Sequence, residues 1–116
     1  MKNNFYITTP IYYVNDIPHL GHAYTSFVAD TISRYKRLSN FDVYFTTGTD
    51  EHGQKVENSA RDKNINTSEF TDKVSSRFKG LCAKLKLTNN DFIRTTENRH
   101  KNKVQKIWNT YVKDPP

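Results

Sequence analysis

The sequence predicts an α/β fold in which helices flank a parallel β-sheet. A β-branched and aromatic segment at Phe5–Thr9 is typical of a strand, and a second such segment follows at Asp42–Thr47. Between them, apolar residues recur with the spacing of an amphipathic helix over residues 20–38. Strand, helix and strand in this order make a βαβ unit, whose two strands run parallel. The length of 116 residues fits a single domain, residues 1–116.

Particular residues mark the ends of these elements. Pro10 has no amide hydrogen to donate to a sheet, so it is expected to end the first strand. Arg34, Lys36 and Arg37 fall in the last turns of the helix, where positive charge interacts favourably with the helix dipole. Gly48 is expected to break the second strand.

The second half of the chain is predicted to be mainly helical. A short helix is expected at about residues 53–62, a longer helix after the capping residue Asn66, and a short extended segment at Asp91–Arg94. A last, basic helix is expected to begin at Thr96-Glu97. The longer helix carries an apolar stripe of Phe70, Val74, Phe78, Leu81, Leu85 and Leu87, and the last helix one of Val104, Ile107, Trp108 and Tyr111.

The composition excludes several classes of protein. Apolar residues make up 34% of the chain, so the core is expected to be thin. No segment approaches the roughly 20 apolar residues of a membrane span, and the N-terminus lacks the apolar run of a signal peptide. We therefore expect a cytoplasmic protein with no membrane partner. The single cysteine, Cys82, cannot form an intramolecular disulfide and is expected to be a buried thiol.

Positive charge is concentrated in the second half. Residues 1–60 hold 5 basic and 6 acidic side chains, a net charge of −1, whereas residues 61–116 hold 13 and 6, a net charge of +7. A surface of this kind is typical of proteins that bind a polyanion, and RNA is favoured over DNA. Solvated helix faces are the alternative explanation of the same charge.

The first candidate site is the motif Pro18-His19-Leu20-Gly21-His22 at the start of the first helix. The two imidazoles are expected to share one helix face, Gly21 to let the backbone approach a ligand, and the free N–H groups of the helix start to attract an anion. Imidazole donors placed there could stabilise charge on phosphate oxygens during nucleotidyl transfer. Two alternatives stay open: the histidines only cap the helix, or they belong to a metal site.

The second candidate site is Thr47-Gly48-Thr49-Asp50-Glu51-His52-Gly53, directly after the second strand. Ligands of parallel sheets bind beyond the carboxyl ends of the strands, so this motif is expected to face the first. Asp50 could accept a hydrogen bond from an ammonium group, or it could be the N-cap of the next helix. Neither a G-x-G-x-x-G nor a G-x-x-x-x-G-K-[ST] phosphate loop is present, so a phosphate site must use other residues.

Three segments of the chain carry a family resemblance. They are Phe5–Tyr24, with the sequence ITTPIYYVN followed by PHLGHAY, then Thr47–Lys55, and Asp91–Lys101. Together they resemble the bacterial methionyl-tRNA synthetase family over residues 5–111. The H-x-G-H signature within the first segment is shared by class I aminoacyl-tRNA synthetases and related nucleotidyltransferases, and the flanking residues favour the methionine enzymes.

The resemblance implies both a fold and an activity. The chain is expected to form the first half of a Rossmann-like parallel-sheet class I catalytic domain, the amino-terminal portion of that domain. The family activates methionine with ATP to give methionyl-adenylate and transfers it to tRNA(Met), including the initiator tRNA. The partners that the resemblance implies are therefore methionine, ATP and tRNA(Met), and Mg²⁺ accompanies the ATP.

The resemblance also assigns residues to this site. His19, Leu20, Gly21 and His22 would bind ATP, and the two histidines would be catalytic. Asp50 would receive the methionine ammonium, the backbone of Ile11 would hold the amino acid, and Tyr13 would form a wall of the thioether pocket. The supporting residues would be Pro10, Tyr12, Asn15, Gly48, His52 and Gly53.

Other parts of the family pattern are not found in this sequence. It contains no K-M-S-K-S motif, and it departs from the family pattern after Trp108. Zinc is expected only in the connective insertion that family members carry and this chain does not. We expect an incomplete piece with an open sheet edge and weak or no activity of its own. The alternatives are a noncatalytic RNA-binding remnant and another H-x-G-H nucleotidyltransferase.

Overall fold

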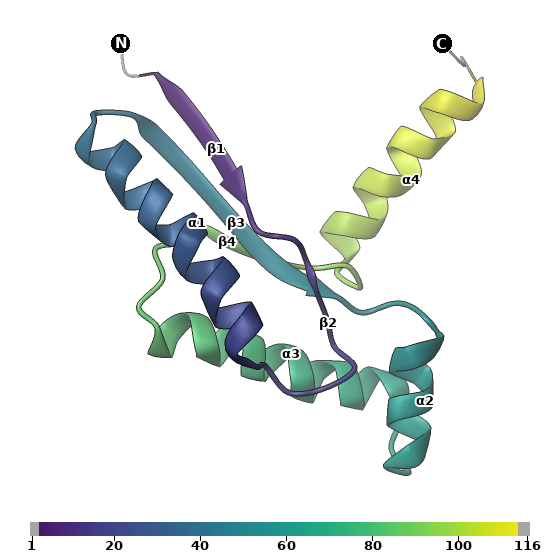
Figure 1. Cartoon of the computed structure of the whole chain (residues 1–116). Helices are drawn as coiled ribbons and strands as arrows, with labels where there is room; N and C mark the ends of the chain where they lie inside the picture. The colour runs from purple at the N-terminus through teal and green to yellow at the C-terminus, as the bar shows by residue number, and fades with distance from the viewer. Residues whose placement is uncertain (1–2, 114–116) are drawn as a thin grey trace.

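The computed structural model describes residues 3–113 and has a four-stranded parallel sheet with helices around it (Figure 1). The strands are β1 (Asn4–Thr8), β2 (Tyr12–Tyr13), β3 (Asp42–Asp50) and β4 (Asp91–Arg94). β3 lies in the centre, with β1 and β2 in succession along one edge and β4 along the other. Every pairing is parallel, as the βαβ pattern predicts.

The four helices lie close to their predicted positions. They are α1 (Leu20–Leu38), α2 (Gln54–Asp62), α3 (Thr67–Lys84) and α4 (Asn98–Lys113). The bounds of α1 agree with the predicted helix at both ends, and Asn66 caps α3 through a 2.8 Å hydrogen bond from Ser68 N–H to its side-chain oxygen. α1 packs on β1 and β3, whereas α4 projects away from the other helices (Figure 1). Within residues 3–113, no helix has the length and apolar character needed to cross a membrane.

One prediction about the strands is wrong, and one strand was not predicted. Gly48 does not break the second strand, because β3 continues through it to Asp50. A Cβ atom at this position would lie 2.0 Å from the carbonyl oxygen of Ile93 in β4, so the glycine is there to let two strands approach. Pro10 ends β1, as expected, but the chain then resumes pairing with the same edge of β3 as β2, which the sequence analysis missed.

One buried cluster lies between the carboxyl half of the sheet and the helices α2 and α3. It contains Tyr12, Val14, Val56, Ala60, Phe70, Val74 and Phe78. Ala29 of α1 and Val43 and Phe45 of β3 are also buried. The predicted stripe of α3 is therefore confirmed for its first three residues, while the leucines that follow are only half-buried. Cys82 is also half-buried, not fully buried as predicted, and its partial burial raises the pKa of the thiol.

Much apolar surface stays exposed. Tyr6 and Tyr44 are paired across β1 and β3, stack with ring centroids 6.2 Å apart, and are exposed by 63% and 50%. The apolar stripe predicted for the last helix is present on α4, but it faces solvent: Val104, Ile107, Trp108 and Tyr111. Within residues 3–113, β1 pairs with β3 alone, so its outer edge is open, as expected.

Candidate functional site

The two histidines form a reciprocal cap at the start of α1. His19 is the N-cap residue, and its Nδ1 accepts a hydrogen bond from Gly21 N–H at 3.1 Å. The Nδ1 atom of His22 accepts in turn from His19 N–H at 3.1 Å. The imidazole centroids lie 3.8 Å apart. Because both Nδ1 atoms accept, the neutral rings carry their protons on Nε2, which leaves two Nε2–H donors for a ligand.

This cap changes the predicted role of the helix start. The N–H groups of His19 and Gly21 are not free for an anion, because the imidazoles occupy them. Gly21 serves the same arrangement: a Cβ atom there would lie 3.0 Å from Cε1 of His19. The capping and ligand-binding alternatives are therefore compatible, since Nδ1 caps the helix and Nε2 remains available.

The ring of His22 is held by aromatic neighbours from two other elements. It makes edge contacts with Tyr12 and Phe78, whose ring centroids lie 4.8 and 5.0 Å away. The Tyr12 hydroxyl contacts the hydroxyl of Ser26 at 2.9 Å and donates to the carbonyl of His22 at 3.3 Å. Burial, with a smaller effect from the neighbouring His19, lowers the pKa of His22. The imidazole is thereby kept neutral at neutral pH.

Asp50 is the last residue of β3 and is not a helix cap. The N-cap of α2 is Gly53, with a φ of 107° and no side-chain capping bond, so the N-cap alternative for Asp50 is wrong. The Oδ1 atom of Asp50 accepts from His52 N–H at 3.2 Å and lies 3.5 Å from the hydroxyl of Thr95. Within residues 3–113, Oδ2 has no hydrogen-bond donor, so it is available to a ligand.

Tyr12 connects the two motifs. Its backbone pairs with Thr49, next to Asp50, while its ring contacts His22. Tyr13, the next residue, pairs directly with Asp50 and is 61% exposed. Ile11 is 40% exposed, and Pro10 and Asn15 are also exposed beside it. The pairing of β2 with β3 thus places Tyr12 and Tyr13 beside the carboxyl end of β3, and the ring of Tyr12 extends this contact to His22.

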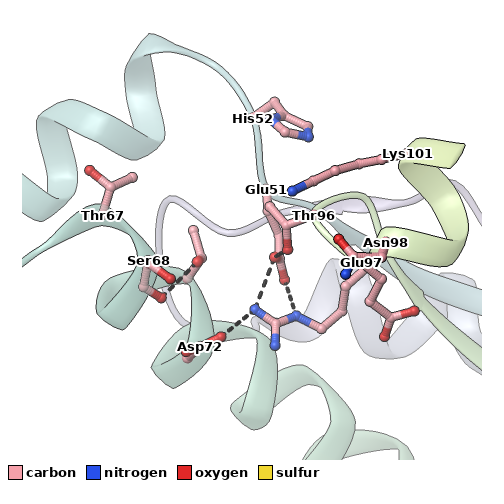
Figure 2. A pocket seen from close by; sticks show the side chains of 11 residues that line it. Glu51, His52, Thr67, Ser68, Asp72, Thr96, Glu97, Asn98 and Lys101 are labelled. Atoms are coloured by element: carbon pink, nitrogen blue, oxygen red, sulfur yellow. Dashed lines mark hydrogen bonds and ion pairs between the residues drawn. The ribbon is translucent and has the colours of Figure 1, made fainter. Parts of the chain in front are cut away.

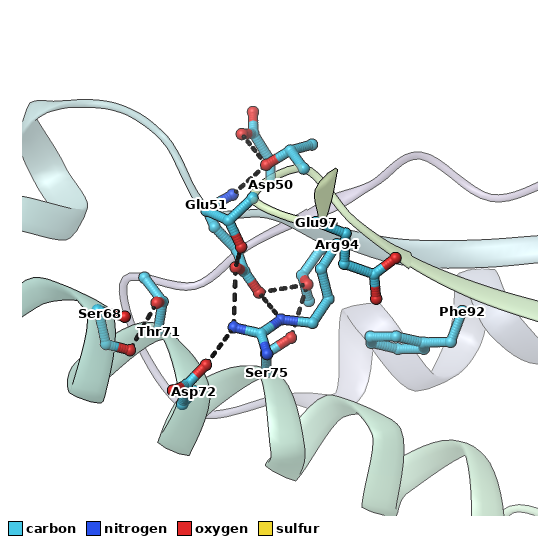
Figure 3. A network of polar contacts seen from close by, with 12 residues as sticks. Asp50, Glu51, Ser68, Thr71, Asp72, Ser75, Phe92, Arg94 and Glu97 are labelled. Carbon is cyan, nitrogen blue, oxygen red and sulfur yellow. Dashed lines mark hydrogen bonds and ion pairs between the residues drawn. The ribbon is translucent and has the colours of Figure 1, made fainter. Parts of the chain in front are cut away.

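A network around Glu51 was not predicted. The side chain of Glu51 is 0% exposed and accepts from Arg94 Nε at 2.6 Å and from a terminal nitrogen of Arg94 at 3.0 Å. Arg94 also binds Asp72 on α3 at 2.6 Å (Figure 3). Burial would raise the pKa of Glu51, but hydrogen bonds led by that of Arg94 outweigh it, so this pKa is lowered. The carboxylate is therefore ionised and fully engaged.

Beside this network is a polar cavity of about 550 Å³ (Figure 2). It lies between the loop after β3, the start of α3 and the start of α4. The side chains of Glu51, His52, Thr67, Ser68, Asp72, Thr96, Glu97, Asn98 and Lys101 surround it. The acidic residues nearest Arg94 are already paired with it, and the hydroxyls of Thr71 and Thr96 donate to Ser68 and Glu51. The donors that remain for a ligand include the hydroxyls of Thr67 and Ser68 and the Lys101 ammonium.

The comparisons with known proteins agree on one family. The family model described as "tRNA synthetases class I (M)" matches residues 5–114. The chain belongs to this family. The methionine–tRNA ligase of Rickettsia conorii is 60% identical over 108 residues, which cover 93% of this chain and 21% of that protein. The corresponding ligase of Listeria monocytogenes is 51% identical over 107 residues, which cover 92% of this chain and 16% of that protein.

A solved structure gives the same result for the fold. Methionyl-tRNA synthetase of Mycobacterium tuberculosis bound by methionyl-adenylate superimposes with a TM-score of 0.93 at 38% identity, covering 95% of this chain and 22% of that chain. The predicted Rossmann-like class I fold is therefore confirmed. This chain spans about a fifth of the length of the Rickettsia relative.

The motifs predicted the histidine pair and Asp50, and also Tyr12 and His52, which contact them. They did not predict Thr95 beside Asp50, Phe78 beside His22, or Arg94 beside Glu51, which come from the third segment or from α3. One signal for Arg94 was available: a charged residue at the end of β4 and Glu51 directly after β3 must meet where parallel strands end. No comparable pattern marks Phe78, which looks like an ordinary core residue of a helix stripe.

Proposed function

We propose that this chain supplies the ATP and methionine contacts for methionine activation and for its transfer to tRNA(Met). The observation that carries the proposal is the pair of Nε2–H donors that the Nδ1 caps leave on His19 and His22, linked through Tyr12 to the free oxygen of Asp50. Phosphate oxygens need hydrogen-bond donors and an ammonium needs a carboxylate. The start of α1 would meet the first requirement and the end of β3 the second.

In the proposed reaction, a carboxylate oxygen of methionine attacks the α-phosphorus of ATP. A bond forms between this oxygen and phosphorus, and the bond from phosphorus to the bridging oxygen of pyrophosphate breaks. The products are methionyl-adenylate and pyrophosphate, and no proton has to be removed because the nucleophile is already ionised. The chain therefore needs no general base, and positioning and charge stabilisation are sufficient.

The imidazole pair would act on the phosphate. The Nε2–H groups of His19 and His22 would donate to α-phosphate oxygens, whose negative charge is redistributed during the reaction. Leu20 is 83% exposed and Gly21 is exposed at the same helix turn, so the backbone there is open to the nucleotide. The lowered pKa of His22 keeps the ring neutral, and it then donates through Nε2 alone.

The edge formed by β2 and β3 would hold methionine. Oδ2 of Asp50 would accept from the α-ammonium, and the Ile11 carbonyl would add a second acceptor. Tyr13 would lie along the thioether, because sulfur packs favourably against an aromatic edge. Pro10, Tyr12, Asn15, Gly48, His52 and Gly53 would support these residues. The M. tuberculosis structure, bound by methionyl-adenylate, supports this assignment by its similarity over 95% of the chain.

Magnesium would arrive with ATP. Within residues 3–113, no three His, Cys, Asp or Glu side chains lie together as a metal-ligand set. The magnesium ion would therefore be bound through the phosphates of ATP. His19 and His22 would contact phosphate oxygens that the metal does not bind. When bound, the ion would neutralise charge on the leaving pyrophosphate.

Exchange of labelled pyrophosphate into ATP, dependent on methionine, tests the proposal on the translated gene product that carries these 116 residues. Two variants of one histidine separate its two nitrogen atoms. His22→Asn retains an acceptor near the position of Nδ1 and loses the outward donor, whereas His22→Gln places an amide donor near the position of Nε2. We expect exchange to fall about 10²–10³-fold in His22→Asn and much less in His22→Gln. Equal losses would contradict the donor role.

RNA binding without catalysis is a second candidate function. Lys101, Lys103 and Lys106 are exposed on α4, and none forms an ion pair within residues 3–113. Such unpaired charges suit a phosphate backbone, whose binding weakens with salt. Salt-sensitive tRNA binding without methionine-dependent exchange would favour this candidate over the enzyme.

A further inference from the structure

We propose that Thr95 is a positioning residue, which orients the Asp50 carboxylate so that one oxygen is left free for the ammonium of the amino acid. This role rests on the proposed function of Asp50. It concerns a residue outside both site motifs, in the segment that joins β4 to α4.

The backbone fixes the position of Thr95. Its N–H donates to the carbonyl of Thr49 at 3.2 Å, which extends the pairing of β3 and β4 by one step. Its own carbonyl lies 3.3 Å from Nε2 of His52. The residue is only 5% exposed. Both backbone contacts are independent of the hydroxyl, so a change confined to the hydroxyl leaves them in place.

The hydroxyl of Thr95 has a single direction available for its proton. Its oxygen accepts from Glu51 N–H at 2.9 Å, so the hydrogen must point to a different group. Oδ1 of Asp50 lies 3.5 Å away and is the side-chain acceptor in reach (Figure 3). This distance is long for a hydrogen bond, as is common for catalytic contacts in structures without substrate.

Two donors thus converge on one oxygen of Asp50. His52 N–H approaches Oδ1 from the loop after β3, at 3.2 Å, and the Thr95 hydroxyl approaches it from the end of β4. Because Oδ1 is held by these donors, the carboxylate cannot rotate freely, and the orientation of Oδ2 is fixed. Binding of an ammonium to this pre-oriented oxygen costs less entropy than binding to a carboxylate that must first be ordered.

Two substitutions test the hydroxyl. Thr95→Val keeps the shape but removes both the donor to Asp50 and the acceptor of Glu51 N–H, while Thr95→Ser keeps both. The control is Thr71→Val: Thr71 is 3% exposed, and its hydroxyl donates to the Ser68 carbonyl at 2.9 Å, away from Asp50. Each variant is made in the translated gene product, and methionine and ATP are varied separately in pyrophosphate exchange, with methionine binding measured by calorimetry.

We expect Thr95→Val to raise the KM and Kd for methionine about tenfold and to leave the KM for ATP within about twofold. Thr95→Ser should restore both methionine constants, and Thr71→Val should change neither. In an Asp50→Asn background, Thr95→Val should add little to the methionine Kd, because the carboxylate that it orients is gone.

The outcomes are distinguishable. If wild-type protein binds methionine and Thr95→Val binds it equally well, the role of Thr95 is overturned and the proposed function stands. The same conclusion follows if the constants for methionine and ATP change together or if serine fails to restore binding. If wild-type protein neither binds methionine nor supports exchange, the proposed function fails, and the positioning role fails with it.

Discussion

Replacing Arg94 with methionine is expected to separate the carboxyl ends of β3 and β4. The substitution leaves the Glu51 carboxylate, 0% exposed, without the cation that contacts it at 2.6 and 3.0 Å. Removing one partner of a buried ion pair costs about 3–5 kcal/mol. The lower end applies, because Arg94 is itself 27% exposed and the hydroxyls of Thr49 and Thr96 still donate to Glu51.

Hydrogen exchange at the amides of β3 and β4 measures this change, because it reports local opening whatever else the polypeptide contains. A loss of about 3 kcal/mol is roughly a hundredfold faster exchange. Arg61→Met is the matched control: its ion pair with Glu57 is exposed by 72% and 59%, and such pairs contribute at most about 0.5 kcal/mol. Exchange in Arg94→Met within about threefold of wild type would refute the reasoning.

The pH dependence gives a second check on the same variant. In the wild type the pKa of Glu51 is lowered, so the stabilisation from its ionised form is present at neutral pH and is lost as the pH falls through this lowered pKa. Without Arg94, burial dominates and raises the pKa of Glu51. The destabilisation in Arg94→Met should therefore be largest near neutral pH and should shrink as acid protonates the carboxyl.

Two further predictions concern Gly48 and His22. Gly48→Ala should disrupt β4 and lower the free energy of unfolding by about 1–3 kcal/mol or more, because its Cβ atom would meet the Ile93 backbone at 2.0 Å. Gly80→Ala should raise the free energy of unfolding by about 0.5–1 kcal/mol, because Gly80 lies in helix α3 with no atom within 4 Å of the added Cβ. Thermal melts that rank the two variants in the opposite order would contradict this. The pKa of His22 is lowered in the folded protein, so below the ordinary histidine pKa of 6.5 the unfolded chain binds a proton that the folded protein does not. The free energy of unfolding should therefore decline as the pH falls below 6.5. His22→Gln should flatten this decline in thermal melts recorded from about pH 5 to 7.5.

The parts of the fold that local patterns govern could be predicted. Helix α1 has the predicted bounds because its apolar spacing and its caps agree with each other. The parallel order of β1 and β3 follows from the helix that joins them. The two site motifs were located on the same grounds, since one lies at the start of the predicted helix and the other directly after a predicted strand.

Contacts between distant segments could not be predicted in the same way. Gly48 carries the local signal of a turn, and only the approach of Ile93, 45 positions further along the chain, explains why it lies inside a strand. The stop expected at Pro10 was correct, but the return of the chain to β3 depends on the register of Tyr12 with Thr49. The partners of Glu51 and Asp50 come from β4 and the segment after it, whose placement depends on the sheet.

The same dependence explains why β3 carries so much of the candidate site. Every other strand pairs with it, so the positions of Tyr13, Asp50 and Arg94 are all set by register along one strand. Asp50 gains its free oxygen only because β3 extends past Gly48, which brings the residue level with β2 on one side and Thr95 on the other. A β3 that ended at Gly48, as local sequence predicts, would leave Asp50 in a loop without either neighbour. The close approach at Gly48 is therefore a requirement of the site as well as of the sheet.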